Sequence, residues 1–187
     1  SKYSDVVKSV TENLDKFELG IALSNLYDFI WENFCDWYIE LVKPRLFDKE
    51  NPTGKTAQYV LTYVLSNTMK LLHPFMPFIT EEIWQHLPHE GESIMISEWP
   101  EYDEKLNFPK DVESMELIMQ SISAIRNRRA EMNVPPSKKA KVIIVTDKTD
   151  VFKQGTAFFE KLASASEAVV QTDKSGIRDN AVNVVVP

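Results

Sequence analysis

The segment from Leu23 to Leu41 constrains the fold most, because apolar side chains recur along it every three or four residues. Ser24, Asp28, Glu32 and other polar residues fall between the apolar ones. This spacing predicts a long amphipathic helix with an aromatic buried face, which Pro44 is expected to end. The expected buried residues are Leu23, Leu26, Ile30, Phe34, Trp37 and Leu41, flanked by Tyr27, Trp31 and Tyr38.

Three further helical patterns accompany this segment. One runs from Ser4, a plausible N-cap, to about Phe17, with a break expected before Gly20. Another carries its apolar face from Val60 to Leu72, and a third covers about residues 112–132. We predict a mainly α fold, with an antiparallel helical bundle over residues 1–110. Residues 88–109 would form a loop over this bundle, anchored by Ile94, Ile96 and Trp99.

The stretch HPFMPFITEEIWQ predicts a rigid corner between two helices. Pro74 is expected to close the first helix, and Pro77 suits the first position of the second, where its missing N–H costs nothing. Ile79 and Ile83, four residues apart, are expected to face inward.

After NVPPS, which ends the preceding helical pattern, short runs of β-branched residues appear in the sequence. We predict a small α/β subdomain over residues 111–187, in which the helix is followed by strand, helix, strand and strand. The expected ranges are 141–145, 151–163, 168–171 and 182–186. Because the chain stops inside the last predicted strand, we expect it to be a portion of a longer polypeptide.

Charge and composition limit the possible partners. The 187 residues carry a formal net charge of −7, which disfavours indiscriminate phosphate binding. Six basic residues nevertheless lie between Arg126 and Lys141 with only Glu131 to oppose them. The chain has no apolar run of the roughly 20 residues that a membrane helix needs, and no signal peptide at its start. The single cysteine, Cys35, fits a reducing cytoplasm.

No sequence motif indicates catalysis. The chain contains no G-x-S-x-G, P-loop or G-x-G-x-x-G motif. Cys35 and His73 could pair as nucleophile and base, but a free cysteine in an apolar stripe is usually a small buried hydrophobe. His86, His89, Glu90 and Glu92 resemble a loose metal cluster, although solvated loop residues are the better interpretation. We therefore predict no catalytic residue and no metal site.

Arg126 and Arg129 lie one turn apart on the third predicted long helix, and Lys138 and Lys139 follow shortly after it. Such a group can hold phosphates. The alternative is an ordinary solvated face in which the arginines pair with acids such as Glu131.

Three stretches together resemble the valyl-tRNA synthetase family: FELGIALSNLYDFIWENFCDWYIELVKPRL, LLHPFMPFITEEIWQ and IRNRRAEMNVPPSKK. The middle stretch is shared by the class I synthetases for valine, isoleucine and leucine, whereas the first and third are typical of the valine enzyme. The resemblance covers nearly the whole chain, in the family's order.

The resemblance implies the anticodon-binding bundle of a larger cytoplasmic ligase, whose partner is tRNA(Val) and which has no membrane role. The family's catalytic domain, with its HIGH and KMSKS motifs, uses ATP with Mg to make valyl-adenylate, and neither motif occurs in these residues. The catalytic and editing domains, an upstream bundle helix and a coiled-coil arm would lie elsewhere in the polypeptide. No cofactor is expected within these residues.

The resemblance further implies that the CDWY helix lines the anticodon site, through Asp36, Ile39, Glu40 and Lys43. Ile39, expected off the buried stripe, would pack on a base, Asp36 would accept from a base amino group and Lys43 would meet phosphate. The alternative for Asp36 and Glu40 is that they only make the outer face of the helix soluble. The residues expected at the tRNA backbone are Arg126, Arg129, Lys138 and Lys139. The alternatives are the corresponding domain of the isoleucine enzyme, a helical protein-interaction module, and a hydrolase that uses Cys35.

Overall fold

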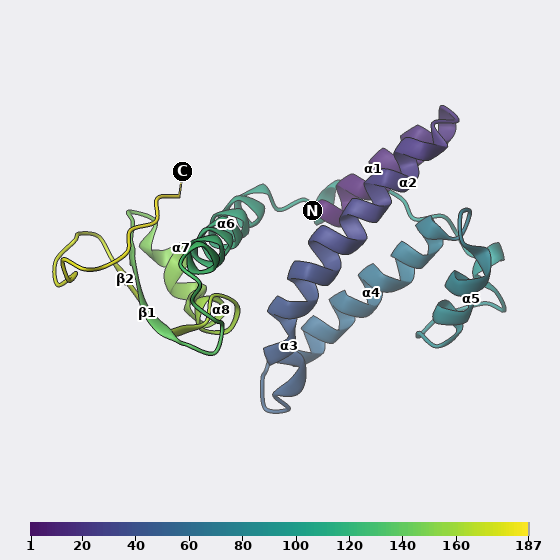
Figure 1. The fold of residues 1–187 in the computed structure, drawn as a ribbon. Coiled ribbons are helices and arrows are strands. Elements are labelled where there is room, and N and C mark those ends of the chain that lie inside the picture. The colour runs from purple at the N-terminus through teal and green to yellow at the C-terminus, as the bar shows by residue number, and fades with distance from the viewer. Residues whose placement is uncertain (187) are drawn as a thin grey trace. The chain divides into compact units, whose positions relative to one another are not determined.

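The computed structural model describes residues 1–186, which form two compact units (Figure 1). Unit 1 is Ser1–Phe108, and unit 2 begins at Pro109. Unit 1 is helical, and unit 2 adds a small two-stranded sheet, so the predicted mainly α fold with a small α/β part is confirmed.

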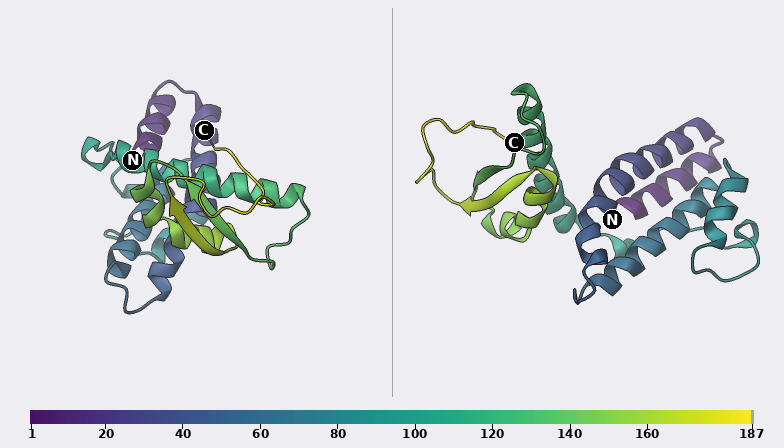
Figure 2. Two further views of the ribbon diagram at one scale, coloured as in Figure 1. Left: turned by 90° about the vertical axis from the view of Figure 1, so that its left-hand side faces the viewer. Right: turned by 60° about the horizontal axis from the view of Figure 1, so that its bottom comes forward.

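Unit 1 is built around a long rod made of three consecutive elements. These are α2 (Leu19–Asp28), η1 (Phe29–Ile39) and α3 (Glu40–Phe47). Helix α1 (Lys2–Asp15) and helix α4 (Gly54–Leu72) lie alongside this rod (Figure 2). The main core lies between them and consists of Tyr3, Val7, Val10, Ala22, Leu26, Phe29, Phe34 and Leu71.

Element η1 is a π-helix and differs from the regular α-helix that the sequence pattern predicts. Its hydrogen bonds join residues i and i+5, so side chains about four or five apart share a face. Phe29 and Phe34, five apart, are both buried and their rings stack with centroids 6.4 Å apart. Trp31, which the α-helical pattern places in the core, is 52% exposed.

Two predicted helix limits are wrong. Ser4 is not an N-cap but a buried residue inside α1, which begins at Lys2. Pro44 does not end the rod, because α3 continues to Phe47. The fixed φ angle of proline is compatible with a helix, so α3 passes through Pro44 at the cost of one backbone N–H donor.

The corner between α4 and α5 (Pro77–Gln85) forms as expected, with Pro77 at the start of α5. The Thr80 hydroxyl donates to the Met76 carbonyl at 2.8 Å, and His73 Nδ1 lies 2.8 Å from the same hydroxyl oxygen. Ile79 is 47% exposed, so its predicted inward position is wrong. The α5 residues that are buried instead are Thr80 and Trp84.

The loop after α5 contains two short 3₁₀ turns, η2 (Ile94–Ile96) and η3 (Glu104–Leu106). Ile94 packs with Met69 and Trp84 in a second small core. Trp99 packs against the main core, and its Nε1 donates to Thr11 Oγ1 at 2.9 Å. Ile94 and Trp99 therefore anchor the loop as predicted, whereas Ile96 is exposed because η2 turns it outward.

Unit 2 contains α6 (Pro109–Glu131) and a strand–helix–helix–strand segment. Strands β1 (Ala140–Val145) and β2 (Ala165–Gln171) pair in parallel, and α7 (Thr149–Gln154) and α8 (Thr156–Leu162) connect them. The single predicted helix over 151–163 is divided at Gly155. A Cβ at this position would lie 2.7 Å from Ile118 Cδ1, so α6 packs directly against the glycine.

The third predicted strand, residues 182–186, is wrong. These residues have no regular structure, and Val185 is 91% exposed. Valine favours a strand only where it can pair with a neighbouring strand and pack its side chain against a buried face.

Candidate nucleic-acid interface

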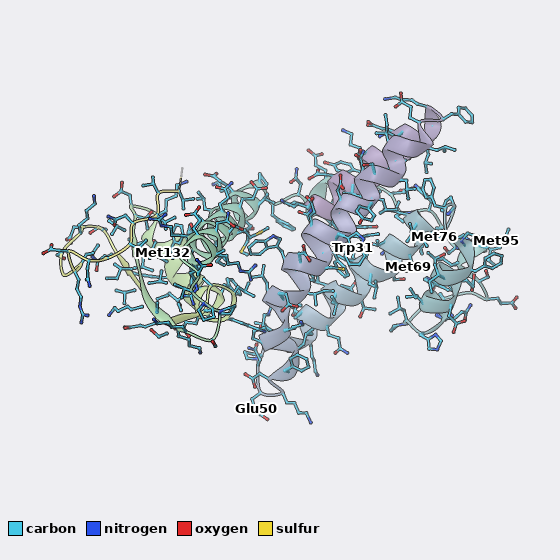
Figure 3. The ribbon with its side chains drawn as sticks, in the orientation of Figure 1. Trp31, Glu50, Met69, Met76, Met95 and Met132 are labelled. Atoms are coloured by element: carbon cyan, nitrogen blue, oxygen red, sulfur yellow. The ribbon has the colours of Figure 1, made fainter. Side chains whose placement is uncertain are left out.

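An exposed face of η1 combines an aromatic ring with a carboxylate. Trp31 and Asp36 are five residues apart, a spacing that a π-helix places on one face, and both are exposed. Tyr27, 60% exposed, continues this face, with its ring centroid 6.2 Å from that of Trp31. Figure 3 labels Trp31 on the rod. Such a face can stack on an unpaired base and accept a hydrogen bond from a base amino group.

Ile39 does not lie where the sequence predicts it. It is half-buried and packs against the main core. The cause is again the π-helix, because Ile39 is five residues after Phe34 and follows it onto the buried face. Ile39 therefore supports η1 from inside.

Glu40 and Lys43 form an ion pair with each other on the first turn of α3. Both side chains are half-buried, at 36% and 37% exposure. A lysine held in this way offers a positioned cation, but it must exchange its carboxylate partner before it can bind a phosphate.

The turn between α3 and α4 gathers cations that the sequence prediction did not single out. Arg45 Nε donates to Thr53 Oγ1 at 2.9 Å, and Gly54 approaches the Arg45 carbonyl so closely that a Cβ would lie 2.9 Å from the oxygen. Lys49 and Lys55 are exposed at this turn. The signal was present in KPRLFDKENPTGK, where four basic residues lie within 13 positions.

In unit 2, the two predicted arginines have structural partners. Arg126 Nε donates to the Leu162 carbonyl at 2.6 Å. Arg129 donates to the carbonyls of Pro135, at 3.0 Å, and Lys138. The acid Glu131 instead pairs with Arg128, at 2.9 Å. These bonds tie α6 to α8 and to the loop before β1, so the arginines contribute to the fold of unit 2.

Lys138 and Lys139 are exposed, and among residues 1–186 neither has an ion pair. They follow the proline pair that Arg129 holds, so their backbone is fixed while their ammonium groups face water. In the predicted basic group, Arg126 and Arg129 donate hydrogen bonds to backbone carbonyls, whereas no such bond is seen for the side chains of Lys138 and Lys139 among residues 1–186.

The remaining candidates for chemistry have local roles. Burial raises the pKa of the Cys35 thiol, with the Asp36 carboxylate adding to the shift, which opposes thiolate formation. His86 Nδ1 lies 2.8 Å from the Glu82 carbonyl, and His89 Nδ1 lies 2.8 Å from that of Leu87. No helix in residues 1–186 combines the length and apolarity needed to cross a bilayer.

Comparison with known proteins identifies the class. The family described as the anticodon-binding domain of tRNA ligase matches residues 1–144. The chain belongs to this family.

The individual relatives are more specific. The chain is 51% identical over its full length to the valine–tRNA ligase of Clostridium perfringens, and 49% identical over 99% of its length to that of Clostridium acetobutylicum. The enzyme from Carboxydothermus hydrogenoformans is 49% identical over 92% of the chain. The predicted resemblance to valine enzymes is confirmed. The chain spans only about a fifth of these relatives, 21% of the first two.

Proposed function

We propose that this chain recognises the anticodon of tRNA(Val) on behalf of a valine–tRNA ligase. The observation that carries the proposal is the exposed Trp31–Asp36 face of a π-helix, inside a domain of the anticodon-binding family. Trp31 stacks on a splayed anticodon base, and Asp36 accepts a hydrogen bond from a base amino group.

Rigidity is what makes this face useful. The buried side of η1 is held by stacked rings, with Phe34 and Tyr38 centroids 5.8 Å apart at an interplanar angle of 16°. Ile39 is fixed in the same core. A base that binds Trp31 therefore meets a surface that is already ordered, which lowers the entropic cost of binding.

Cations at two places would hold the tRNA backbone. In unit 1 they are Lys43, released from Glu40, and the exposed Lys49 and Lys55 at the α3–α4 turn. In unit 2 they are Lys138 and Lys139. These contacts position the RNA, whereas the bases supply the specificity.

Bond formation takes place elsewhere in the parent enzyme. We place the ATP and Mg site in a catalytic domain outside this chain, and no cofactor within the chain itself. Anticodon binding would direct the distant acceptor end of tRNA to that domain. A reducing cytoplasm is the expected location, as for protein synthesis in general.

The test is a binding measurement with anticodon stem-loops. The chain, and a full-length ligase that carries its sequence, are titrated with stem-loops bearing a valine or a non-valine anticodon at two salt concentrations. Preference for the valine anticodon, with affinity falling as salt rises, supports the proposal. Equal affinity of the full-length ligase for both stem-loops contradicts it.

A further inference from the structure

Two tyrosine rings are exposed side by side on α4. Tyr59 is 71% exposed and Tyr63 is 38% exposed, and their ring centroids lie 6.4 Å apart at an interplanar angle of 20°. The two residues are four positions apart in a regular α-helix, so they lie on one face. The exposed Lys55, four positions before Tyr59, lies on the same face. We call Lys55, Tyr59 and Tyr63 the α4 face.

Other aromatic rings connect the α4 face to the main core. Tyr63 meets the Tyr3 ring edge-on, with centroids 6.0 Å apart at an angle of 79°, and the Tyr3 centroid lies 6.1 Å from that of Phe29. Tyr3 and Phe29 are both buried. Tyr59 is the most exposed ring of this series, so it rests on an ordered support. A ring held in this way loses little conformational entropy when a partner stacks on it.

The charge of α4 suits a phosphate ligand. The 19 residues of this helix include two lysines and no aspartate or glutamate, although the chain has 28 acids. Arg45 adds a cation at the start of α4, because its guanidinium donates to the Thr53 hydroxyl at 2.9 Å and to the Thr53 carbonyl at 3.2 Å. The whole preceding segment, residues 43–53, carries three cations and two acids. The end of the α4 face at Lys55 is therefore positive.

An acid lies at the other end of the α4 face. Burial raises the pKa of the Tyr63 hydroxyl, and Tyr59 and the Asp103 carboxylate add to the shift, so Asp103 lies near Tyr63. A phosphate is attracted to Lys55 and repelled by Asp103. An uncharged base can stack on Tyr59, which lies between the two ends.

We propose that the α4 face is a second contact with tRNA(Val), in which Tyr59 stacks on an unpaired base and Lys55 binds an adjacent phosphate. The inference rests on the proposed function, from which it takes the partner, and it adds a site on a different helix from η1. Because every base has a face that can stack on an aromatic ring, this contact contributes affinity and leaves the choice of anticodon to the η1 face.

Replacement of Tyr59 tests the stacking. The full-length ligase, as wild type, Tyr59→Ala and Tyr59→Phe, is titrated with two tRNA(Val) transcripts, one with the valine anticodon and one with a non-valine anticodon. We expect Tyr59→Ala to bind both at least about fivefold more weakly, with their affinity ratio unchanged, and Tyr59→Phe to bind as wild type does. Phe78→Ala, which removes a 90% exposed ring from α5, is the control and should keep wild-type affinity. Wild-type affinity in Tyr59→Ala would overturn the inference.

Tyrosine nitration identifies what covers the α4 face. The full-length ligase is treated with a dilute nitrating reagent, with and without tRNA(Val), and nitration is followed by mass spectrometry. We expect Tyr59 to react without tRNA and to be protected severalfold when tRNA is added, while Tyr102, 40% exposed, reacts equally in both. Protection of Tyr59 without tRNA would assign the face to another part of the ligase, and equal rates would show that RNA does not cover it. Either result overturns the inference.

The inference and the proposed function fail separately. Equal wild-type affinity for the two transcripts would contradict the choice of anticodon, while weaker binding by Tyr59→Ala would still support the α4 face. Preference for the valine anticodon, with wild-type affinity in Tyr59→Ala, would remove only the α4 face.

Discussion

Trp31 and Asp36 are assigned to recognition because they are exposed on a face whose opposite side is packed. Residues of similar chemistry nearby serve the fold instead. Arg126 and Arg129 direct their guanidinium groups to backbone carbonyls, whereas Lys138 and Lys139 keep their charges in water. Chemical type alone does not separate these roles, because the difference lies in where each side chain finds its hydrogen-bond partner.

Replacing Asp36 tests its role in reading a base. A carboxylate only accepts hydrogen bonds, whereas the amide of Asp36→Asn also donates, so its preference among bases changes. We expect the discrimination between valine and non-valine stem-loops to fall by up to about tenfold, which is about 1.4 kcal/mol. Glu12→Gln, at an exposed position of α1, is the matched control for the lost charge. Unchanged discrimination in Asp36→Asn would remove this residue from the site.

Gly54 is predicted to be required for the α3–α4 turn. A Cβ at Gly54 would lie 2.9 Å from the Arg45 carbonyl oxygen, so backbone must move in Gly54→Ala. We expect a loss of about 1–3 kcal/mol in the free energy of unfolding, measured by urea denaturation. Gly20→Ala is the control, because no atom lies within 4 Å of its Cβ position in α2, and it should gain about 0.5–1 kcal/mol.

The π-helix η1 explains why the sequence pattern misplaced Trp31 and Ile39. The end of α4 at Leu72, the corner at Pro77 and the positions of β1 and β2 follow from local signals, namely apolar periodicity, proline and β-branched runs. The α-helical period also predicts the rod. It does not predict a change to i→i+5 bonding between Phe29 and Ile39, nor the contact of the Phe29 ring with Tyr3 of α1, with centroids 6.1 Å apart. Trp31, expected to be buried, is therefore exposed, and Ile39, expected to be exposed, packs against the core.

Long-range hydrogen bonds are a second feature that the local sequence pattern does not predict. Nothing in the sequence near Arg126 identifies the Leu162 carbonyl as its partner, 36 positions away. The same holds for Trp99 and Thr11, 88 positions apart. The sequence correctly indicates a basic region and an aromatic loop anchor. Only the fold shows which of these side chains already have hydrogen-bond partners within the protein.

Glu81 of α5 accepts hydrogen bonds from the Ser93 hydroxyl and the Ile94 N–H at η2, and the stability that these bonds provide should depend on pH. Hydrogen bonds from Gln85, Ser93 and the Ile94 N–H lower the pKa of the Glu81 carboxyl below its ordinary value. A lowered folded-state pKa gives a contribution that is complete above the unfolded pKa, about 4.3, and is lost as pH falls through the folded value. The urea stability of the wild type should therefore exceed that of Glu81→Gln near neutral pH and converge with it in acid. A constant difference across this range would show that the carboxylate charge is not involved.

Charge is divided unequally over the molecule. The chain as a whole is acidic, and the region from Lys70 to Lys105 carries eight acids with no basic residue between these two lysines. The exposed lysines that could meet phosphate lie outside that region, at the α3–α4 turn and before β1. An acidic protein can thus bind RNA locally while its other surfaces repel nucleic acid.

Salt dependence measures the backbone contacts made by unit 2. Replacing both Lys138 and Lys139 by alanine should reduce the slope of log affinity against log salt by about 1 for each phosphate that is no longer neutralised. The ratio of affinities for valine and non-valine anticodons should remain the same, since phosphate contacts carry no sequence information. Replacing Arg126 and Arg129 is not a suitable control, because their hydrogen bonds to backbone carbonyls contribute to the fold of unit 2. Lys161→Ala, at an exposed position of α8, serves instead and should leave the slope unchanged.

Trp31 provides the most direct test of the central claim, that an exposed face of the π-helix binds anticodon bases. The measurement is the affinity of the full-length ligase for the valine stem-loop, in the wild type, Trp31→Phe and Trp31→Ala. Base–aromatic stacking is worth about 1–3 kcal/mol, so Trp31→Ala should bind at least about fivefold more weakly and Trp31→Phe should retain most of the affinity. Because Trp31 is 52% exposed, its replacement should alter the free energy of unfolding little. Wild-type affinity in a stably folded Trp31→Ala ligase would contradict the account.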